Sequence, residues 1–381
     1  MGGALDGIRI VEFLGIGPGP FAGMMLADHG AEVIRVVRPG PSRDLSLFER
    51  HDVLGRSRTV IQVDMKAPEG RAVVRDLCRT ADGVIEGYRP GVMERLGLGP
   101  DVLLADTPRL VYGRVTGWGQ DGPLAQAAGH DINYIALNGV LHSVGREGCK
   151  PVPPLNYVGD FGGGGMLLAF GMAAALLAVA RGGTGQVIDA AMVDGSSLLA
   201  GMVWQMKAAK LWVEETGGNT LSGAAPFYDS YACADGRHIA IGSIEPAFYL
   251  LLRQALGIAD DPLFDAQMDR ATWAEASGRI AALFATRTRA EWCAIMEGTD
   301  ICFAPVLSFD EALDHPHMRA RSAFLEVDGC IQPTPAPRFS ATPAAAPRGV
   351  EAGHGNAAVL LTGLGYAPDR VAVLEADGVI A

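Results

Sequence analysis

The N-terminal third of the chain alternates short apolar runs with segments of helical periodicity. We expect strands at residues 8–13, 31–37, 59–63, 83–86 and 110–115, and helices at residues 21–29 and 69–78. Short strands that are apolar along their whole length are typical of a parallel sheet with both faces covered. Because these strands alternate with helices, the pattern predicts a doubly wound α/β domain at the start of the chain.

The longest apolar run, residues 166–180, follows four consecutive glycines and ends at Arg181. It falls short of the roughly 20 residues that span a bilayer, so we expect a buried helix and no membrane span. A strand from Gly185 and a helical stretch through about Leu211 follow. No basic stretch with an apolar core opens the chain, which argues against a secretory signal.

The pattern changes near residue 226. Two β-rich runs flank Asp235-Gly236 and predict a hairpin, and Glu245 is the candidate N-cap of a helix that opens at Pro246. We therefore expect three parts. These are a large α/β domain with linker helices at 1–225, a smaller α+β domain at 226–320, and a segment at 321–381 that returns to the large domain.

The charge distribution suggests a ligand. The formal net charge of −12 argues against a general nucleic-acid partner. Basic and acidic residues balance over the first hundred positions, yet basic residues outnumber acidic ones between positions 35 and 66. This local excess favours a bound anion, with a solvated basic surface as the alternative. The basic residues are Arg35, Arg38, Arg43, Arg50, Arg56, Arg58 and Lys66.

Cysteine and histidine usage points away from disulfides and metals. The six cysteines include no Cys-x-x-Cys pair, and the eight histidines form no metal-binding array. We therefore expect neither a disulfide framework nor a structural zinc site. A reducing cytoplasm is the location that fits this composition.

The turn after the first strand, residues 15–20, only partly matches a dinucleotide fingerprint. Read from Gly15 the Gly-x-Gly-x-x-Gly pattern fails at a proline, and read from Gly17 only the looser form ending in alanine is met. The second strand carries Arg35 and Arg38 where an NAD-binding protein has an acidic residue. An arginine there suits a sugar phosphate, so NADP and the 3′-phosphate of coenzyme A are both candidates.

Two residues could carry the chemistry, His130 and Asp160. An imidazole exchanges protons near neutral pH, and an opposed carboxylate would let the pair move a proton between two faces of one carbon. The start of the apolar helix would favour ionised Asp160, and the glycines after it are candidates for an oxyanion site. Each residue alone also has a structural interpretation, as a loop histidine and a helix cap. No Gly-x-Ser-x-Gly or P-loop motif is present.

Several motifs together resemble the class III CoA-transferase superfamily and, within it, the α-methylacyl-CoA racemases. The resemblance covers essentially the whole chain, and its most specific part is Gly129-His-Asp-x-x-Tyr134 coupled to Gly159-Asp-Phe161. Transferases of this superfamily use an aspartate at the position of Asp160 as the acyl-accepting nucleophile and lack the histidine. The combination of His130, Asp160 and Glu245 is the racemase pattern. Further matching segments are Val11-Glu12-Phe13, Asp64-Met65-Lys66, and residues 86–91, 117–123 and 189–194.

The resemblance implies a 2-methyl-branched acyl-CoA substrate of fatty acid metabolism and an interlocked homodimer. His130 would remove the α-proton of the 2S substrate, and Asp160 would then donate a proton to the opposite face of the carbon. With the 2R substrate, Asp160 would remove the proton and His130 would donate one. Glu245 would orient His130, in the same chain or across the dimer, while Asn156 would bond Asp160 and Tyr134 would line the site. No metal or separate cofactor is implied, because coenzyme A belongs to the substrate.

The resemblance also assigns substrate contacts. Basic residues would meet the CoA phosphates, residues 63–66 would meet the adenine, and Met202 and Met206 would either lie under the acyl tail or pack in the core. The assigned positions are Arg38, Val63, Asp64, Met65, Lys66, Gly87, Tyr88, Arg89, Arg95, Gly129, Asp131, Ile132, Asn133, Tyr134 and Asn156.

Four functions stay open at this point. The racemase is the first, and a CoA transferase that forms an acyl anhydride on Asp160 is the second. A non-catalytic acyl-CoA-binding protein and an NADP oxidoreductase are the others. The sequence does not specify the natural acyl chain.

Overall fold

The computed structural model describes residues 3–13, 15–40, 51–350, 355 and 357–381. The chain forms two compact units. Unit 1 contains Met1–Asn138, Leu155–Ala200 and Ser322–Ala381, and unit 2 contains Gly139–Pro154 and Gly201–Arg321. The contacts thus group residues 139–154 and 201–225 with the small unit, whereas the sequence pattern had suggested the large one.

Unit 1 is built on a six-stranded, wholly parallel sheet in the order β3-β2-β1-β4-β5-β6. The strands lie within one or two residues of their predicted positions. Their bounds are β1 Arg9–Phe13, β2 Glu32–Val37, β3 Arg58–Gln62, β4 Gly83–Glu86, β5 Val111–Thr116 and β6 Gln186–Ala191. The strand order reverses between β1 and β4, which makes this the doubly wound arrangement that the pattern predicted.

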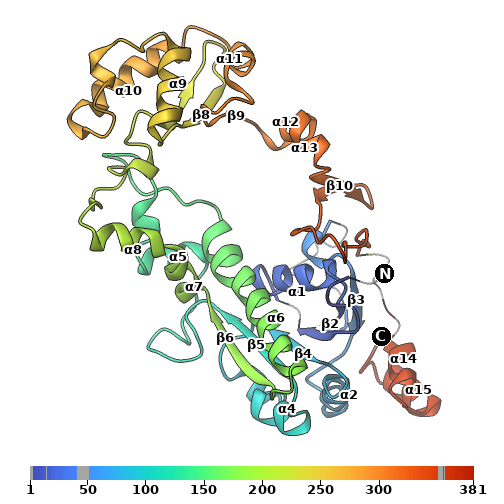
Figure 1. Cartoon of the computed structure of the whole chain (residues 1–381). Coiled ribbons are helices and arrows are strands. Elements are labelled where there is room, and N and C mark those ends of the chain that lie inside the picture. The colour runs from blue at the N-terminus through green and yellow to red at the C-terminus, as the bar shows by residue number, and fades with distance from the viewer. Residues whose placement is uncertain (1–2, 14, 41–50, 351–354, 356) are drawn as a thin grey trace. The chain divides into compact units, whose positions relative to one another are not determined.

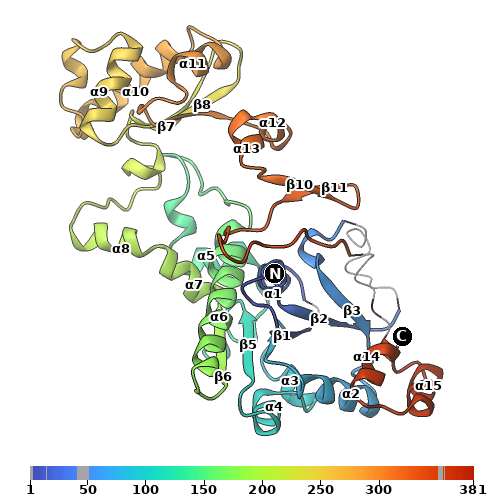
Figure 2. The same cartoon turned by 45° about the vertical axis from the view of Figure 1, so that its right-hand side comes forward.

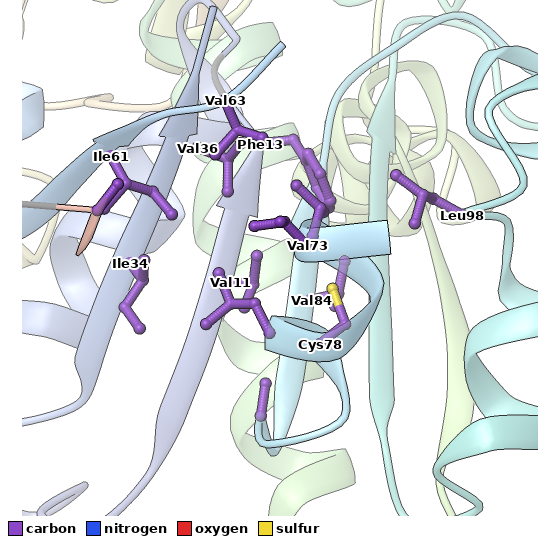
Figure 3. Close-up of a cluster of buried hydrophobic side chains, with 14 of the residues drawn as sticks. Val11, Phe13, Ile34, Val36, Ile61, Val63, Val73, Cys78, Val84 and Leu98 are labelled. Atoms are coloured by element: carbon purple, nitrogen blue, oxygen red, sulfur yellow. The ribbon is translucent and has the colours of Figure 1, made fainter. Parts of the chain in front are cut away.

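Helices cover both faces of this sheet. One core cluster packs Val73 and Cys78 of α2 (Pro68–Cys78) over Val11 and Val84 of the sheet (Figure 3). The other core lies under α1 (Pro18–Asp28) and α6 (Leu167–Ala180), and Figures 1 and 2 show α6 beside β5 and β6. The remaining helices of unit 1 are α3 Val92–Arg95, α4 Pro100–Asp106, α5 Asp131–Leu137, α7 Met192–Leu199, α14 Ala357–Gly363 and α15 Pro368–Ala376, with the 3₁₀ turn η1 Val53–Gly55.

The four glycines before α6 are themselves helical. A π-helix, η3 (Tyr157–Met166), runs through them into α6, so the helix starts nine residues before its predicted start. A Cβ on Gly163 would lie 2.6 Å from Ser196 N of α7, and one on Gly165 would lie 2.9 Å from Pro18 O of α1. The glycines therefore allow close packing against two helices, and the oxyanion role expected for them stays a prediction.

The continuous helix Tyr157–Ala180 is longer than the apolar run 166–180, which by itself is too short to span a bilayer. Its 24 residues are long and apolar enough to cross a membrane by those two measures, and half of its most apolar stretch is buried in the protein. Buried residues Leu168 and Met172 belong to the core of unit 1. The expectation that this segment is too short therefore fails, while the expectation that it packs in the core agrees with the structure.

Unit 2 contains an antiparallel sheet, β7-β8-β9, with helices packed against it. The predicted hairpin forms from β7 Tyr228–Ala232 and β8 His238–Gly242, and Phe227, Ile239, Trp273 and Phe284 are central in the core. The other elements are η2 Leu141–Ser143, α8 Gly201–Ala208, η4 Thr220–Ser222, α9 Pro246–Leu256, η5 Pro262–Phe264, α10 Arg270–Phe284, α11 Arg289–Met296, β9 Phe303–Val306, α12 Phe309–Asp314 and α13 Pro316–Ala320.

The C-terminal segment packs on unit 1 after the hairpin β10 (Phe324–Val327) and β11 (Cys330–Pro333). Its last residues lie antiparallel to the chain just after β3. Asp64 N–H donates to Val379 O at 2.8 Å, and Ala381 N–H donates to Gln62 O at 3.1 Å. The C-terminal residues therefore brace the stretch that the sequence assigned to adenine.

Candidate active site

The carboxyl ends of the parallel strands bring the assigned residues to one edge of unit 1. Arg38 follows β2, residues 63–66 follow β3, residues 87–89 follow β4, and Gly117 follows β5. In open α/β sheets ligands bind outside this edge, near the point where the strand order reverses. That point lies between β1 and β4 in this protein.

His130 is the N-cap residue of α5 and is exposed in the single chain. Its backbone N–H donates to Asn133 Oδ1 at 3.0 Å, and the Asn133 N–H donates back to the His130 carbonyl at 2.8 Å. Asn133 therefore uses its side chain to fix the backbone of His130.

Asp160 lies in the first turn of η3 and is partly buried. Asn156 Nδ2 donates to Asp160 Oδ2 at 3.2 Å, as expected from the resemblance. Burial raises the pKa of the Asp160 carboxyl above its ordinary value, and the Asn156 hydrogen bond partly offsets that shift. The charge of Asp131 raises this pKa further, whereas His130 lowers it. His130 thus lies close enough to Asp160 to influence the ionisation of that carboxyl.

The turn after β1 contributes to the same place. Gly17 has φ 73° and precedes α1. A Cβ on Gly17 would lie 3.3 Å from Asp160 Oδ2, so the carboxylate lies beside the N-terminus of α1. A helix N-terminus favours a negative charge and partly counters the effect of burial. Gly17 and Asp160 lie 143 positions apart in the chain, so their proximity became visible only in the fold.

Tyr134 closes the loop around His130. Its hydroxyl donates to Gly129 O at 2.5 Å, and its ring packs edge-on against Trp118 with centroids 4.9 Å apart. Burial and the charges of Asp160 and Asp131 raise the pKa of Tyr134 to about 12. A Cβ on Gly117 would lie 2.1 Å from the Tyr134 ring, which explains a glycine in that motif. Tyr134 is therefore a neutral wall of the site near Asp160.

Asp131 lies between the two candidate catalytic residues. It follows His130 directly, and its Oδ1 accepts the backbone N–H of Asp160 at 2.7 Å. Its side chain is buried, with 6% of the residue exposed. The next residue, Ile132, is exposed. The structure thus joins the two most specific motifs of the sequence through a single carboxylate.

The candidate nucleotide residues differ in exposure. Arg38, Lys66, Arg89 and Arg95 are exposed, whereas Val63 is buried. Lys66 N–H donates to Asp64 Oδ1 at 2.9 Å, which makes a compact turn next to half-buried Met65. Burial raises the pKa of Tyr88, and Arg38 lowers it, which places Arg38 within electrostatic reach of the Gly87-Tyr88 turn. Arg38, Lys66 and Arg89 are thus cations on loops at one sheet edge.

Three other arginines of the basic segment have a structural role instead. Arg35 and Arg58 are buried and both contact Glu12, with N···O distances of 2.9 Å. Arg56 is buried against Asp28 at 2.5 Å. The expected anion site therefore loses these three residues. Arg43 and Arg50 lie outside the described residues.

Glu245 belongs to unit 2, so the structure does not relate it to His130. It occupies the N-cap position of α9, but its side chain makes no capping hydrogen bond. The expected helix-cap role therefore holds by position only. Burial raises the pKa of the Cys302 thiol, and the charges of Glu245 and Asp300 raise it further. Glu245 therefore lies within electrostatic reach of Cys302.

Unit 2 contains an open apolar cavity of about 890 Å³. Met202 and Met206 line it, so these methionines face a cavity rather than a closed core. Arg146 and Asp229 form an ion pair at 2.5 Å in the same lining. The other large side chains of the lining include Trp212, Leu221, Tyr228 and Phe303.

Comparison with known proteins identifies the family. The model of CoA-transferase family III matches residues 5–353. The chain belongs to CoA-transferase family III. Alpha-methylacyl-CoA racemase of Mus musculus is 44% identical over 380 residues, covering 99% of this chain and 97% of that protein. The Homo sapiens protein of the same name is 46% identical over 342 residues, covering 90% and 88%.

A solved structure shows the same fold. The crystal structure of a CAIB/BAIF family protein from Brucella suis superposes with a TM-score of 0.78 at 25% sequence identity, covering 96% of this chain and all of that chain. The expected family and the α/β fold are thus confirmed, and the expected similarity to the racemases is confirmed as well. The roles of individual residues stay predictions.

Proposed function

We propose that this protein interconverts the 2R and 2S forms of 2-methylacyl-CoA thioesters. The observation that carries this proposal is the pairing of His130 with Asp160, joined through Asp131, in a chain 44% identical to a racemase. A transferase needs only the aspartate as nucleophile. A racemase needs two groups that act on opposite faces of one carbon.

The reaction is a proton transfer through an enolate. Asp160 takes the α-proton of the 2R substrate, and the electron pair of the C–H bond moves into the thioester. The His130 imidazolium then gives a proton to the opposite face, which leaves Asp160 protonated and His130 neutral. Burial raises the pKa of the Asp160 carboxyl and so favours its protonated form, which helps this group to act as an acid as well as a base. The reverse direction uses the same groups in opposite order.

Each unit, taken by itself, offers groups that suit one part of the substrate. The exposed cations Arg38, Lys66 and Arg89 would meet the phosphates of coenzyme A, and residues 63–66 would hold the adenine. The apolar cavity of unit 2, with Met202 and Met206, would accept the branched acyl tail. Flexible thioethers adapt to varied chains, which suits more than one acyl group.

We also propose that two copies of the chain interlock. Each unit exposes large apolar side chains on helices. Phe170 of α6 is 71% exposed, Leu198 of α7 is 68% exposed, and Trp204 of α8 is 57% exposed. Surfaces of this kind mark contacts with a partner. A second copy would cover them and could bring Glu245 to His130 of the other chain, and sedimentation would reveal the dimer.

The deciding experiment incubates each enantiomer of a 2-methylacyl-CoA in deuterium oxide. We expect incorporation of α-deuterium with inversion from both enantiomers, and sterol-like, pristanoyl and aryl-propionyl thioesters should rank the acyl preference. A parallel reaction offers a free carboxylate as acceptor. CoA transfer without α-exchange, abolished by Asp160→Ala but tolerant of His130→Ala, would instead establish the transferase.

A further inference from the structure

Asp131 makes one short contact and leaves one oxygen without a partner. Its Oδ1 accepts the Asp160 N–H at 2.7 Å, which fixes the first turn of η3. Its Oδ2 is buried and, among the described residues, has no hydrogen-bond partner. A buried carboxylate oxygen without a partner is costly, so it requires a reason other than fold stability.

Gly159 shows how closely the two segments approach. A Cβ on Gly159 would lie 2.4 Å from Asp131 Oδ1 and 3.3 Å from Asp131 Cα. Any side chain at position 159 would therefore push Asp131 away from Asp160. Glycine here and aspartate at 131 form one unit, because each is needed for the contact that the other makes.

We propose that Asp131 is a positioning residue, whose carboxylate fixes the backbone of Asp160 at a set distance from the imidazole of His130. The inference rests on the proposed racemase function. Covalent linkage places Asp131 next to His130, and a hydrogen bond places it on Asp160. Racemisation depends on the spacing of two groups across one carbon, and small misplacements of such groups cost about 100-fold in rate.

The charge of Asp131 adds a second effect. It raises the pKa of the Asp160 carboxyl, as burial does, while His130 lowers it. The pKa of Asp160 is thus raised by Asp131, the first residue of α5, and lowered by His130, the N-cap residue of the same helix. The other titratable or charged groups on elements packed against η3 are Asp28 on α1, Tyr134 on α5, Tyr112 and Arg114 on β5, Asp189 on β6 and Asp194 on α7.

The test compares Asp131→Ala and Asp131→Asn in the full-length protein, with each enantiomer in deuterium oxide. Asp131→Ala loses the contact, so exchange and inversion of the 2R substrate should both fall about 100-fold. His130 still deprotonates the 2S substrate, and exposed imidazolium exchanges with solvent. For the 2S substrate, the rate of α-deuterium exchange should therefore exceed the rate of inversion. A general loss of stability would lower both rates and would not change their ratio.

Asp131→Asn keeps an oxygen for the Asp160 N–H but removes the charge. Inversion should stay within about tenfold of wild type, since the spacing is retained. The rate with the 2R substrate rises as Asp160 loses its proton. Because removal of the Asp131 charge lowers the pKa of Asp160, this limb of the pH profile should move to lower pH.

Asp82→Asn is the matched control. Asp82 Oδ2 also accepts a backbone N–H, that of Arg9 at 2.8 Å, but at the amino end of the sheet. The Asp82→Asn variant should change the stability of the protein without altering the ratio of exchange to inversion. The inference is overturned if Asp131→Ala lowers all four rates in equal proportion, or lowers none. Wild-type protein without any α-exchange would overturn the racemase function itself.

Discussion

Two groups of carboxylates in unit 1, Glu12 on the one hand and Asp131 with Asp160 on the other, differ in how completely their oxygens are paired. Glu12 of β1 is fully buried, and both of its oxygens are paired. Oε1 accepts two hydrogen bonds from Arg35 at 3.1 and 2.9 Å, and Oε2 accepts one from Arg58 at 2.9 Å. Helix α1 also has a glycine, Gly23, where it passes the Glu12 carboxylate. A Cβ at that position would lie only 2.5 Å from Glu12 Oε2.

Asp131 and Asp160 have far fewer partners. Asn156 is the side chain that donates to Asp160, and one oxygen of Asp131 has no partner within the described residues. The carboxylates of Asp131 and Asp160 also lie close together, and the negative charge of Asp131 disfavours the ionised form of Asp160. The carboxylate of Glu12, which holds the sheet together, is paired on both oxygens, whereas the carboxylates of the candidate site are only partly paired, as is common where pKa values are perturbed for function. The two groups can be compared by experiment.

The largest expected effect is that of Asp160→Asn on activity. An amide cannot take or give the α-proton, so racemisation should fall about 10²–10⁴-fold. The pKa of Asp160 is raised by burial, which means that its ionised form opposes folding above that pKa. The free energy of unfolding in urea at pH 7 should therefore not fall. A loss of both activity and stability would contradict the contrast drawn with Glu12.

Glu12→Gln should show the opposite behaviour. Two buried guanidinium groups would lose their charged partner, and breaking a buried pair in this way costs about 3–5 kcal/mol. Glu32→Gln is the control, because Glu32 pairs with Arg9 at 2.8 Å on the surface, where such pairs contribute about 1 kcal/mol or less. Urea denaturation measures both. Equal, small effects of the two variants would show that burial does not separate them.

The same contrast explains how far the sequence reaches. Strand positions in unit 1 were predictable to within two residues, because a doubly covered strand must be apolar throughout and is bounded by turns. The sequence also identified His130 and Asp160, since both lie in short, unusual motifs. These signals are local, and local signals can be read without a fold.

The parts that escaped prediction depend on partners far along the chain. Glycine has low helix propensity, so the predicted helix began after Gly163 and Gly165, yet these residues are helical and pack against α7 and α1. A count of charges cannot distinguish Arg35, paired with Glu12, from exposed Arg38. The contact between Asp131 and Asp160 spans 29 positions and has no sequence signal of its own.

The smallest effect is the sharpest test of the comparison, because Arg35 and Arg38 lie three positions apart. Arg38→Ala should raise KM for an acyl-CoA by about 10–100-fold, since a charged hydrogen bond contributes about 1.5–3 kcal/mol. It should leave an acyl-pantetheine thioester, which has no nucleotide, unaffected, and should change stability by no more than about 0.5 kcal/mol. Arg35→Ala should instead lower stability and leave KM of the folded fraction unchanged, because its guanidinium faces Glu12 and Asp52 inside the protein. If Arg35→Ala raised KM for the nucleotide substrate alone, the buried cluster would be part of the binding site after all.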